Sequence, residues 1–185
     1  MLNSPVAKVA RWAGLFFSGL FAGFLVAVLV LELSLRGFDR QVYTQVRQVE
    51  LESLDKLAVA TLLPALIATA LLVALTFKAR EVTPWLTLAA LTLLVGVLAL
   101  TLAVNLPINA DQLDWNVQAP PADWATVRDH WQIAHGVRTG AAVLALGALI
   151  ANATGTPRRT RHETPTSTHR GLPAASEDSP LHQRT

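Results

Sequence analysis

The sequence predicts an all-α integral membrane protein with four transmembrane helices in an up-and-down bundle and an ordered outer loop between helices 3 and 4. Of the 185 residues, 52% are hydrophobic and only 15% are charged, whereas a soluble domain carries about 25% charged residues. The apolar residues form four long blocks, and the first, from Trp12 to Leu31, contains no charge. A run of about 20 apolar residues crosses a bilayer, so the first block alone can span a membrane.

Each block predicts one helix, and we expect helices at residues 12–35, 57–77, 85–106 and 137–151. The last can be extended toward its start, because Pro120, Pro121 and Asp123 form a stop-and-cap sequence and helix formers follow from Trp124. The first block exceeds the 7 to 15 apolar residues of a signal peptide, so we interpret it as an uncleaved membrane helix.

Basic residues predict the orientation of the bundle. Nine of the 15 lie on the side of the termini: Lys8, Arg11, Lys78, Arg80, Arg158, Arg159, Arg161, Arg170 and Arg184. The other side holds six: Arg36, Arg40, Arg47, Lys56, Arg128 and Arg138. By the positive-inside rule, we expect a multi-pass protein of the plasma (inner) membrane with both termini cytoplasmic.

The segments between and after the spans also have patterns. Residues 36–56 carry Val42, Val46, Val49 and Leu54 at near-helical spacing, which predicts an amphipathic helix leading into the second span. Residues 153–185 are rich in Thr, Ser, Pro and Arg, so we expect a transmembrane domain over residues 1–152 and a disordered cytoplasmic tail.

Several function classes lack support in the sequence. There is no cysteine and no phosphate-binding or zincin motif, and a net charge of +2 does not suggest nucleic-acid binding. His130 and His135 are five residues apart, about 140° around a helix, so they do not face one haem or metal ion. We therefore expect no metal and no cofactor, and the lipid bilayer and a hydrophobic small molecule as partners. The sequence does not predict an oligomeric state.

The start of the fourth helix carries a polar and aromatic stripe. Its members fall within roughly 80° of one another on a helical projection: Trp124, Arg128, Trp131, His135 and Arg138. Ala142, Leu146 and Leu149 continue the same stripe with apolar side chains. A stripe that turns from polar to apolar with depth predicts a cavity that opens at the outer face of the membrane.

Further polar residues are expected to face this stripe. Asn105 and Asn109 are four residues apart at the end of the third helix, where Pro107 is expected to stop the helix. Glu32 lies one turn from the end of the first helix, and a carboxylate there needs a partner such as Arg138 or Arg128. Structural roles remain open: an interface belt for the tryptophans, snorkelling for the arginines and helix capping for the asparagines.

The same residues carry a resemblance to a known family. The motif is Asn105-Leu-Pro-Ile-Asn109, followed by Asp114-Trp115, Pro120-Pro121-Ala-Asp123-Trp124, Arg128, Trp131, His135 and Arg138-Thr139. Over residues 12–152 the chain resembles the anthrone-oxygenase-like family of small four-helix membrane proteins. The resemblance implies oxidation of an anthrone to an anthraquinone by O2 without a cofactor.

Such an oxygenase needs a base, donors for an oxyanion and an apolar pocket. The resemblance suggests His135 as the base, Arg138 and Asn105 as oxyanion donors and Trp131 as a stacking wall. Asn109, Trp124, Arg128 and Glu32 would complete the substrate site. The alternative is a non-catalytic membrane protein that binds a lipid, a small ligand or a partner through the same cavity.

Overall fold

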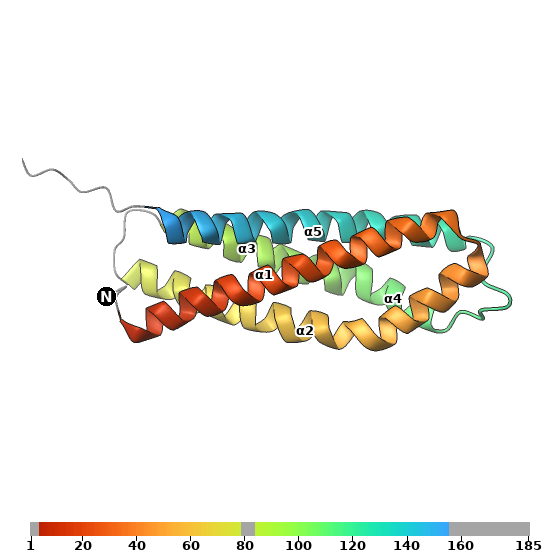
Figure 1. Cartoon of the computed structure of the whole chain (residues 1–185), viewed down its shortest axis with the longest axis horizontal. Helices are drawn as coiled ribbons and strands as arrows, with labels where there is room; N and C mark the ends of the chain where they lie inside the picture. Colours follow the sequence, from red (N-terminus) through yellow and green to blue (C-terminus); the bar gives the residue numbers. More distant parts are fainter. Residues whose placement is uncertain (1–3, 79–83, 156–185) are drawn as a thin grey trace, which may run out of the picture. The chain divides into compact units, whose positions relative to one another are not determined.

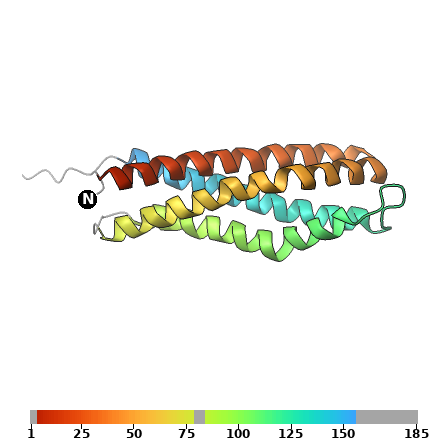
Figure 2. The same cartoon turned by 90° about the horizontal axis from the view of Figure 1, so that it is seen from below.

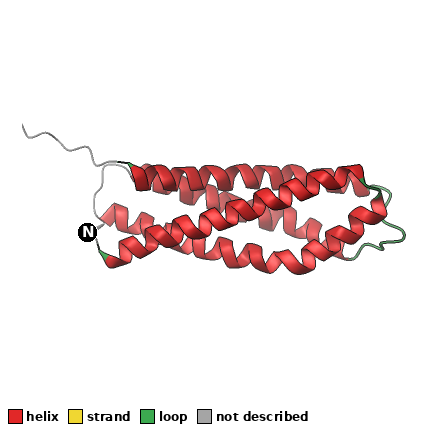
Figure 3. Cartoon of the chain, viewed as in Figure 1, coloured by secondary structure: helices red, strands yellow, loops and turns green. Residues whose placement is uncertain are grey.

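The computed structural model describes residues 4–78 and 84–155, and helices make up nearly all of this part of the chain (Figure 3). The elements are α1 (Pro5–Ser34), the 3-10 turn η1 (Leu35–Gly37), α2 (Arg40–Lys78), α3 (Pro84–Leu100), the π-helical segment η2 (Thr101–Asn105), α4 (Leu106–Leu113) and α5 (Trp124–Thr154). They run up and down in antiparallel order (Figure 1). The predicted fold class is confirmed. Of the predicted tail, residues 156–185 lie outside the described residues, as do residues 79–83 of the expected turn after Lys78.

The spans of the bundle follow from length and composition. Four helical stretches are long and apolar enough to cross a membrane, namely Pro5–Gly37, Arg40–Lys78, Trp85–Leu113 and Trp124–Thr154. Trp12, Phe77 and Trp85 are exposed at the end of the bundle where the chain termini lie, as aromatic residues at a membrane interface are. About 20 residues further along, the span needed for the hydrocarbon, the helices reach Glu32, Leu57 and Asn105. The chain is thus a multi-pass membrane protein with a polar layer near one membrane boundary.

Two helix starts are explained by local capping. Ser4 accepts a hydrogen bond from the amide of Ala7 at 3.2 Å, and Pro5 occupies the first position of α1, where its missing N–H costs nothing. Asp39 Oδ1 accepts from the amides of Gln41 and Val42 at 2.9 and 3.0 Å. This cap lets α2 begin directly after the turn that follows α1.

The predicted amphipathic segment is helical, but it is continuous with the second span. At 39 residues, α2 is about 58 Å long and therefore extends well beyond the hydrocarbon. The valine side does not face the bundle: Val42 and Val49 are exposed, while Tyr43, Arg47 and Glu50 are buried. The polar side packs inward because the neighbouring helices present partners for it.

The expectation that Pro107 stops the third helix is wrong. The chain passes from α3 through the π-helical segment η2 directly into α4, and its path bends there (Figure 2). Pro107 stands in the first turn of α4, a position that tolerates its missing N–H. The π-helical turn adjusts the hydrogen-bond ladder so that the helix continues past the proline.

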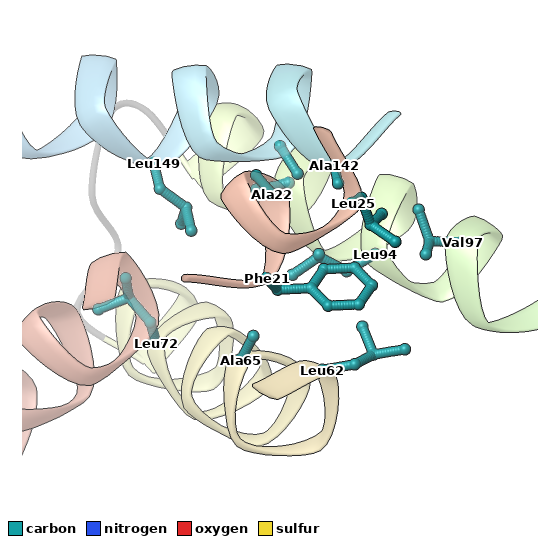
Figure 4. Packing of buried hydrophobic residues seen from close by; sticks show 12 residues of the cluster. Phe21, Ala22, Leu25, Leu62, Ala65, Leu72, Leu94, Val97, Ala142 and Leu149 are labelled. Carbon is teal, nitrogen blue, oxygen red and sulfur yellow. The ribbon is translucent and has the colours of Figure 1, made fainter. Parts of the chain in front are cut away.

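The apolar core fills the half of the bundle nearer the termini. Phe21, Leu25, Leu62, Leu94 and Leu149 belong to one cluster contributed by α1, α2, α3 and α5 (Figure 4). A smaller cluster of Leu35, Tyr43 and Trp115 lies at the other end, which we call the loop end because the α1–α2 turn and the α4–α5 loop lie there. Between the two clusters lies the polar layer that forms the candidate site.

Candidate functional site

A cavity of about 120 Å³ lies between α2 on one side and η2, α4 and α5 on the other. Fifteen residues line it: Phe24, Val28, Arg47, Glu50, Leu51, Leu54, Asp55, Ala58, Val59, Thr101, Leu106, Asn109, Trp131, His135 and Arg138. Val59 and Leu106 are exposed on the outside of the bundle, whereas Trp131 and His135 are buried. The cavity thus reaches from a buried polar interior to an apolar outer rim.

Arg47 is the centre of the buried polar layer. Its Nε donates to Gln112 Oε1 at 2.9 Å, its Nη2 donates to Asn109 Oδ1 at 2.8 Å, and its Nη1 donates to Glu50 Oε2 at 2.9 Å. The same Nη1 lies 3.1 Å from Glu32 Oε1. All three guanidinium nitrogens therefore have partners, as a buried charge requires.

Trp131 is held tightly within this layer. Its Nε1 donates to Asn109 Oδ1 at 2.7 Å. The guanidinium carbon of Arg47 lies 3.8 Å from the ring centroid, and the imidazole of His135 stacks at 4.6 Å with an interplanar angle of 10°. Because two protein groups already stack on Trp131, much of its aromatic surface is not available to a ligand.

His135 and Arg138 form a pair on the next turn of α5. Arginine only donates, so the 2.8 Å contact between Arg138 Nη2 and His135 Nδ1 requires Nδ1 to be the acceptor. His135 Nε2 then carries the proton and donates to the carbonyl of Leu25 at 3.0 Å. Arg138 Nη1 donates to Thr101 Oγ1 at 2.9 Å, so η2 and His135 together orient the guanidinium.

The structure distributes the eight residues proposed from sequence over three places. Asn109, Trp131, His135 and Arg138 line the cavity. Asn105 and Glu32 are fully buried beside it: Asn105 Nδ2 donates to the carbonyl of Trp131 at 3.4 Å, and Glu32 accepts from Gln132 Nε2 at 3.0 Å. Trp124 and Arg128 do not line the cavity.

Three sequence-based expectations about these residues are corrected. Glu32 pairs with Arg47 instead of Arg138 or Arg128, because α2 packs its polar side inward. Trp124 packs on Tyr43 in the loop-end cluster, with ring centroids 5.5 Å apart, and Arg128 lies over Trp124 and bonds Asp129. Neither Asn105 nor Asn109 is a helix cap, since Asn105 makes no cap hydrogen bond and Asn109 binds Arg47 and Trp131.

Sequence reasoning missed the contribution of α2. Tyr43, Arg47 and Glu50 recur at helical spacing, one position beyond the apolar series of Val42, Val46 and Val49. In a water-soluble helix the valines would face inward, but a helix surrounded by lipid can reverse this pattern. The polar series was the available signal for Arg47, Glu50 and, one turn further, Asp55.

The cavity brings together opposite charges from two helices. Glu50 and Asp55 of α2 and Arg138 of α5 all line it. Arg138 Nε and Glu50 Oε1 are buried without a hydrogen-bond partner among the described residues, and unpaired buried polar groups are costly. This arrangement can hold a small polar group of an otherwise apolar molecule, with a guanidinium available for an oxygen and a carboxylate available for a proton.

Comparisons with known proteins agree with this picture of the chain. A comparison with curated proteins and one with solved structures returned no match. A sequence model of the family described as anthrone oxygenase matches residues 55–148, which run from the cavity side of α2 through α3, η2 and α4 into α5. Because the match covers just over half of the chain, and the matched residues form three of the four spans, the protein is a member of the anthrone oxygenase family.

Proposed function

We propose that the protein oxidises a hydrophobic aromatic substrate of the anthrone type with O2 in the cavity between α2 and α5. One observation carries the proposal: a guanidinium, that of Arg138, and carboxylates of α2 line a single cavity whose rim is apolar. Oxidation of an anthrone begins with loss of a carbon-bound proton and the growth of negative charge on the carbonyl oxygen. A cation and a base on opposite walls serve these two events.

The size of the cavity limits how much of the substrate it can enclose. An apolar cavity of about 150 Å³ holds one benzene molecule, so a cavity of about 120 Å³ accommodates about one ring. In our proposal the ring that carries the carbonyl oxygen enters, and the remaining rings stay at the rim among Val59, Leu106 and lipid.

The proposed chemistry is balanced without a further reactant. The C–H bond of the methylene carbon breaks, its electron pair forms an enolate, and this carbon then forms a C–O bond with O2 to give a peroxide. Loss of the second C–H proton and cleavage of the O–O bond give the quinone carbonyl and one water. The carbon atom is oxidised by four electrons and one O2 is reduced by four.

We assign the residues of α5 to the oxyanion. Arg138 donates to the enolate oxygen, and His135 and Thr101 hold the guanidinium in place. His135 is less suited to be the base, because its one free lone pair, on Nδ1, already accepts from Arg138. Asn105 and Trp131 act as supports: Asn105 contacts the backbone of Trp131, and Trp131 packs on His135.

The test uses the full chain, purified and reconstituted in lipid nanodiscs, with anthrone as the probe. We expect one O2 consumed per anthraquinone formed, with no cofactor added. Arg138→Gln should lower kcat by about 10²- to 10³-fold, as removal of one oxyanion donor does, whereas Arg40→Gln at an exposed position should leave it unchanged. Saturable anthrone binding without O2 uptake would support the non-catalytic binding alternative instead.

We also propose that both termini are cytoplasmic in the plasma membrane, on the basis of the nine basic residues on the terminal side against six on the other. The chain contains no cysteine, so single cysteines report cleanly. Cysteine at Asp114 should react with an impermeant maleimide in intact cells, and cysteine at Thr168 should react only after permeabilisation. The opposite result would invert the topology and direct the loop end into the cytoplasm.

A further inference from the structure

We infer that Asp55 is the proton acceptor of this site, an assignment that rests on the proposed oxidation of an acidic C–H substrate. Asp55 lies on α2, lines the cavity and is only partly buried. It makes no hydrogen bond or ion pair with another described residue. Its carboxylate is therefore free to take a proton from a molecule bound in the cavity.

The position of Asp55 relative to Arg138 fits the two events of the first step. Asp55 comes from α2 and Arg138 from α5, and both line the cavity. A ring placed between them presents its carbonyl oxygen to the guanidinium and its acidic C–H to the carboxylate. Charge that moves from the C–H bond to the oxygen thus moves from the anionic wall toward the cationic wall, which lowers the energy of the enolate.

The other acids near the cavity are already engaged. Glu50 Oε2 is bound by Arg47 at 2.9 Å, and its Oε1 is buried out of contact with solvent. Glu32 does not line the cavity and is bound by Arg47 and Gln132. A carboxylate held by a guanidinium is a weaker base than a free one, so Asp55 is the better acceptor.

Asp55 also has a route by which to lose the proton. Glu52 and Lys56 on the same two turns of α2 are exposed, so this level of the helix reaches water or lipid headgroups. In the proposed sequence Asp55 takes the first C–H proton and returns it to the peroxide oxygen, and water carries away any excess. No other proton donor is required.

Removal of the proton can be measured separately from the reaction with O2. Anthrone is incubated anaerobically in D2O with the protein in nanodiscs, and deuterium incorporation at the methylene carbon is followed by mass spectrometry. We expect the wild-type chain to catalyse the exchange. Asp55→Asn should bind anthrone with similar affinity but lose exchange by about 10²- to 10⁴-fold, the usual contribution of an acid–base residue. Asp55→Glu should restore part of it.

The matched control is Glu52→Gln, which removes an exposed carboxylate from the same helix without touching the cavity and should leave the exchange rate unchanged. Asp55→Ser is the second variant, used if Asp55→Asn does not fold. Exchange by Asp55→Asn within threefold of wild type would overturn the inference, even if oxidation itself proceeds. Exchange that depends on Asp55 but is followed by no O2 uptake in air would overturn the oxidation and leave Asp55 as the base. A wild-type chain that neither binds anthrone nor exchanges its protons would refute both.

Discussion

At the scale of single residues, Arg47 decides the stability of the polar layer. It separates two buried carboxylates, and its Nη1 lies 3.1 Å from Glu32 and 2.9 Å from Glu50. Arg47→Gln leaves both without a countercharge, and removal of one partner of a buried pair costs about 3 to 5 kcal/mol. We expect a loss of this size in the free energy of unfolding, measured by denaturant titration in mixed micelles, and a loss below about 0.5 kcal/mol for exposed Arg40→Gln.

A double substitution tests the same pair. If the loss comes from the unpaired charge, Glu32→Gln combined with Arg47→Gln should be less damaging than the sum of the two single changes. Strictly additive losses would show instead that Arg47 stabilises the layer through packing on Trp131.

His135 offers a second prediction at this scale, which separates a positioning role from a base. Asparagine at position 135 keeps an acceptor near the place of Nδ1 for Arg138, whereas alanine removes it. We expect His135→Asn to retain kcat for anthrone oxidation within about tenfold of wild type and His135→Ala to lose about 10²-fold, because a small displacement of a catalytic group has an effect of this order. Equal loss in the two variants, with normal melting temperatures, would return His135 to the role of base.

At the scale of elements, Gln48 joins α2 to the end of α4. Its Nε2 donates to the carbonyls of Gln112, Leu113 and Trp115 at 3.3, 3.2 and 2.8 Å, which satisfies carbonyls that a helix end leaves unpaired. Gln48→Ala should therefore destabilise the region by about 1 to 3 kcal/mol. Hydrogen exchange should accelerate at residues 112–118 and stay unchanged in the centre of α5.

Exposed Glu52→Ala on the same helix provides the comparison for that measurement. It should leave exchange at residues 112–118 at the wild-type rate. Similar acceleration in both variants would mean that α2 responds to loss of side chain in general, and the clamp by Gln48 would lose its support.

At the scale of the whole molecule, the bundle is longer than the hydrocarbon it crosses. If the hydrocarbon ends near Leu57, a spin label at Ile67 should be relaxed strongly by O2 and weakly by a water-soluble nickel chelate. A label at Val42, about 37 Å further along α2, should show the reverse. The measurement is power-saturation EPR in nanodiscs on single-cysteine variants of this cysteine-free chain.

The two labels also test the depth of the cavity. Labels at Glu52 and Lys56 should give intermediate values, since the rim of the cavity is expected at the membrane boundary. Strong O2 relaxation at Val42 would place the whole of α2 within the bilayer and would remove the water route proposed for Asp55.

Some parts of the candidate site could be predicted from sequence because they lie on one helix. Trp131, His135 and Arg138 share a stripe, and a helix of 3.6 residues per turn brings such residues to one side whatever surrounds it. Trp124 and Arg128 share that stripe as well, but the cavity ends below them, where Tyr43 and Trp115 of other segments fill the loop end. The limit of the cavity along the stripe is a property of packing.

The sequence by itself determined the four spans, because a helix in lipid must satisfy its own backbone and be covered by apolar side chains, and both demands are local. Tertiary structure alone decided that Arg47 pairs with Glu32 and Glu50, that the valines of α2 face outward and that η2 carries the chain past Pro107. These features depend on how far each helix is rotated about its axis. That rotation is set by contacts between segments distant in sequence, such as the 100 residues between Glu32 and Gln132, which no local pattern records.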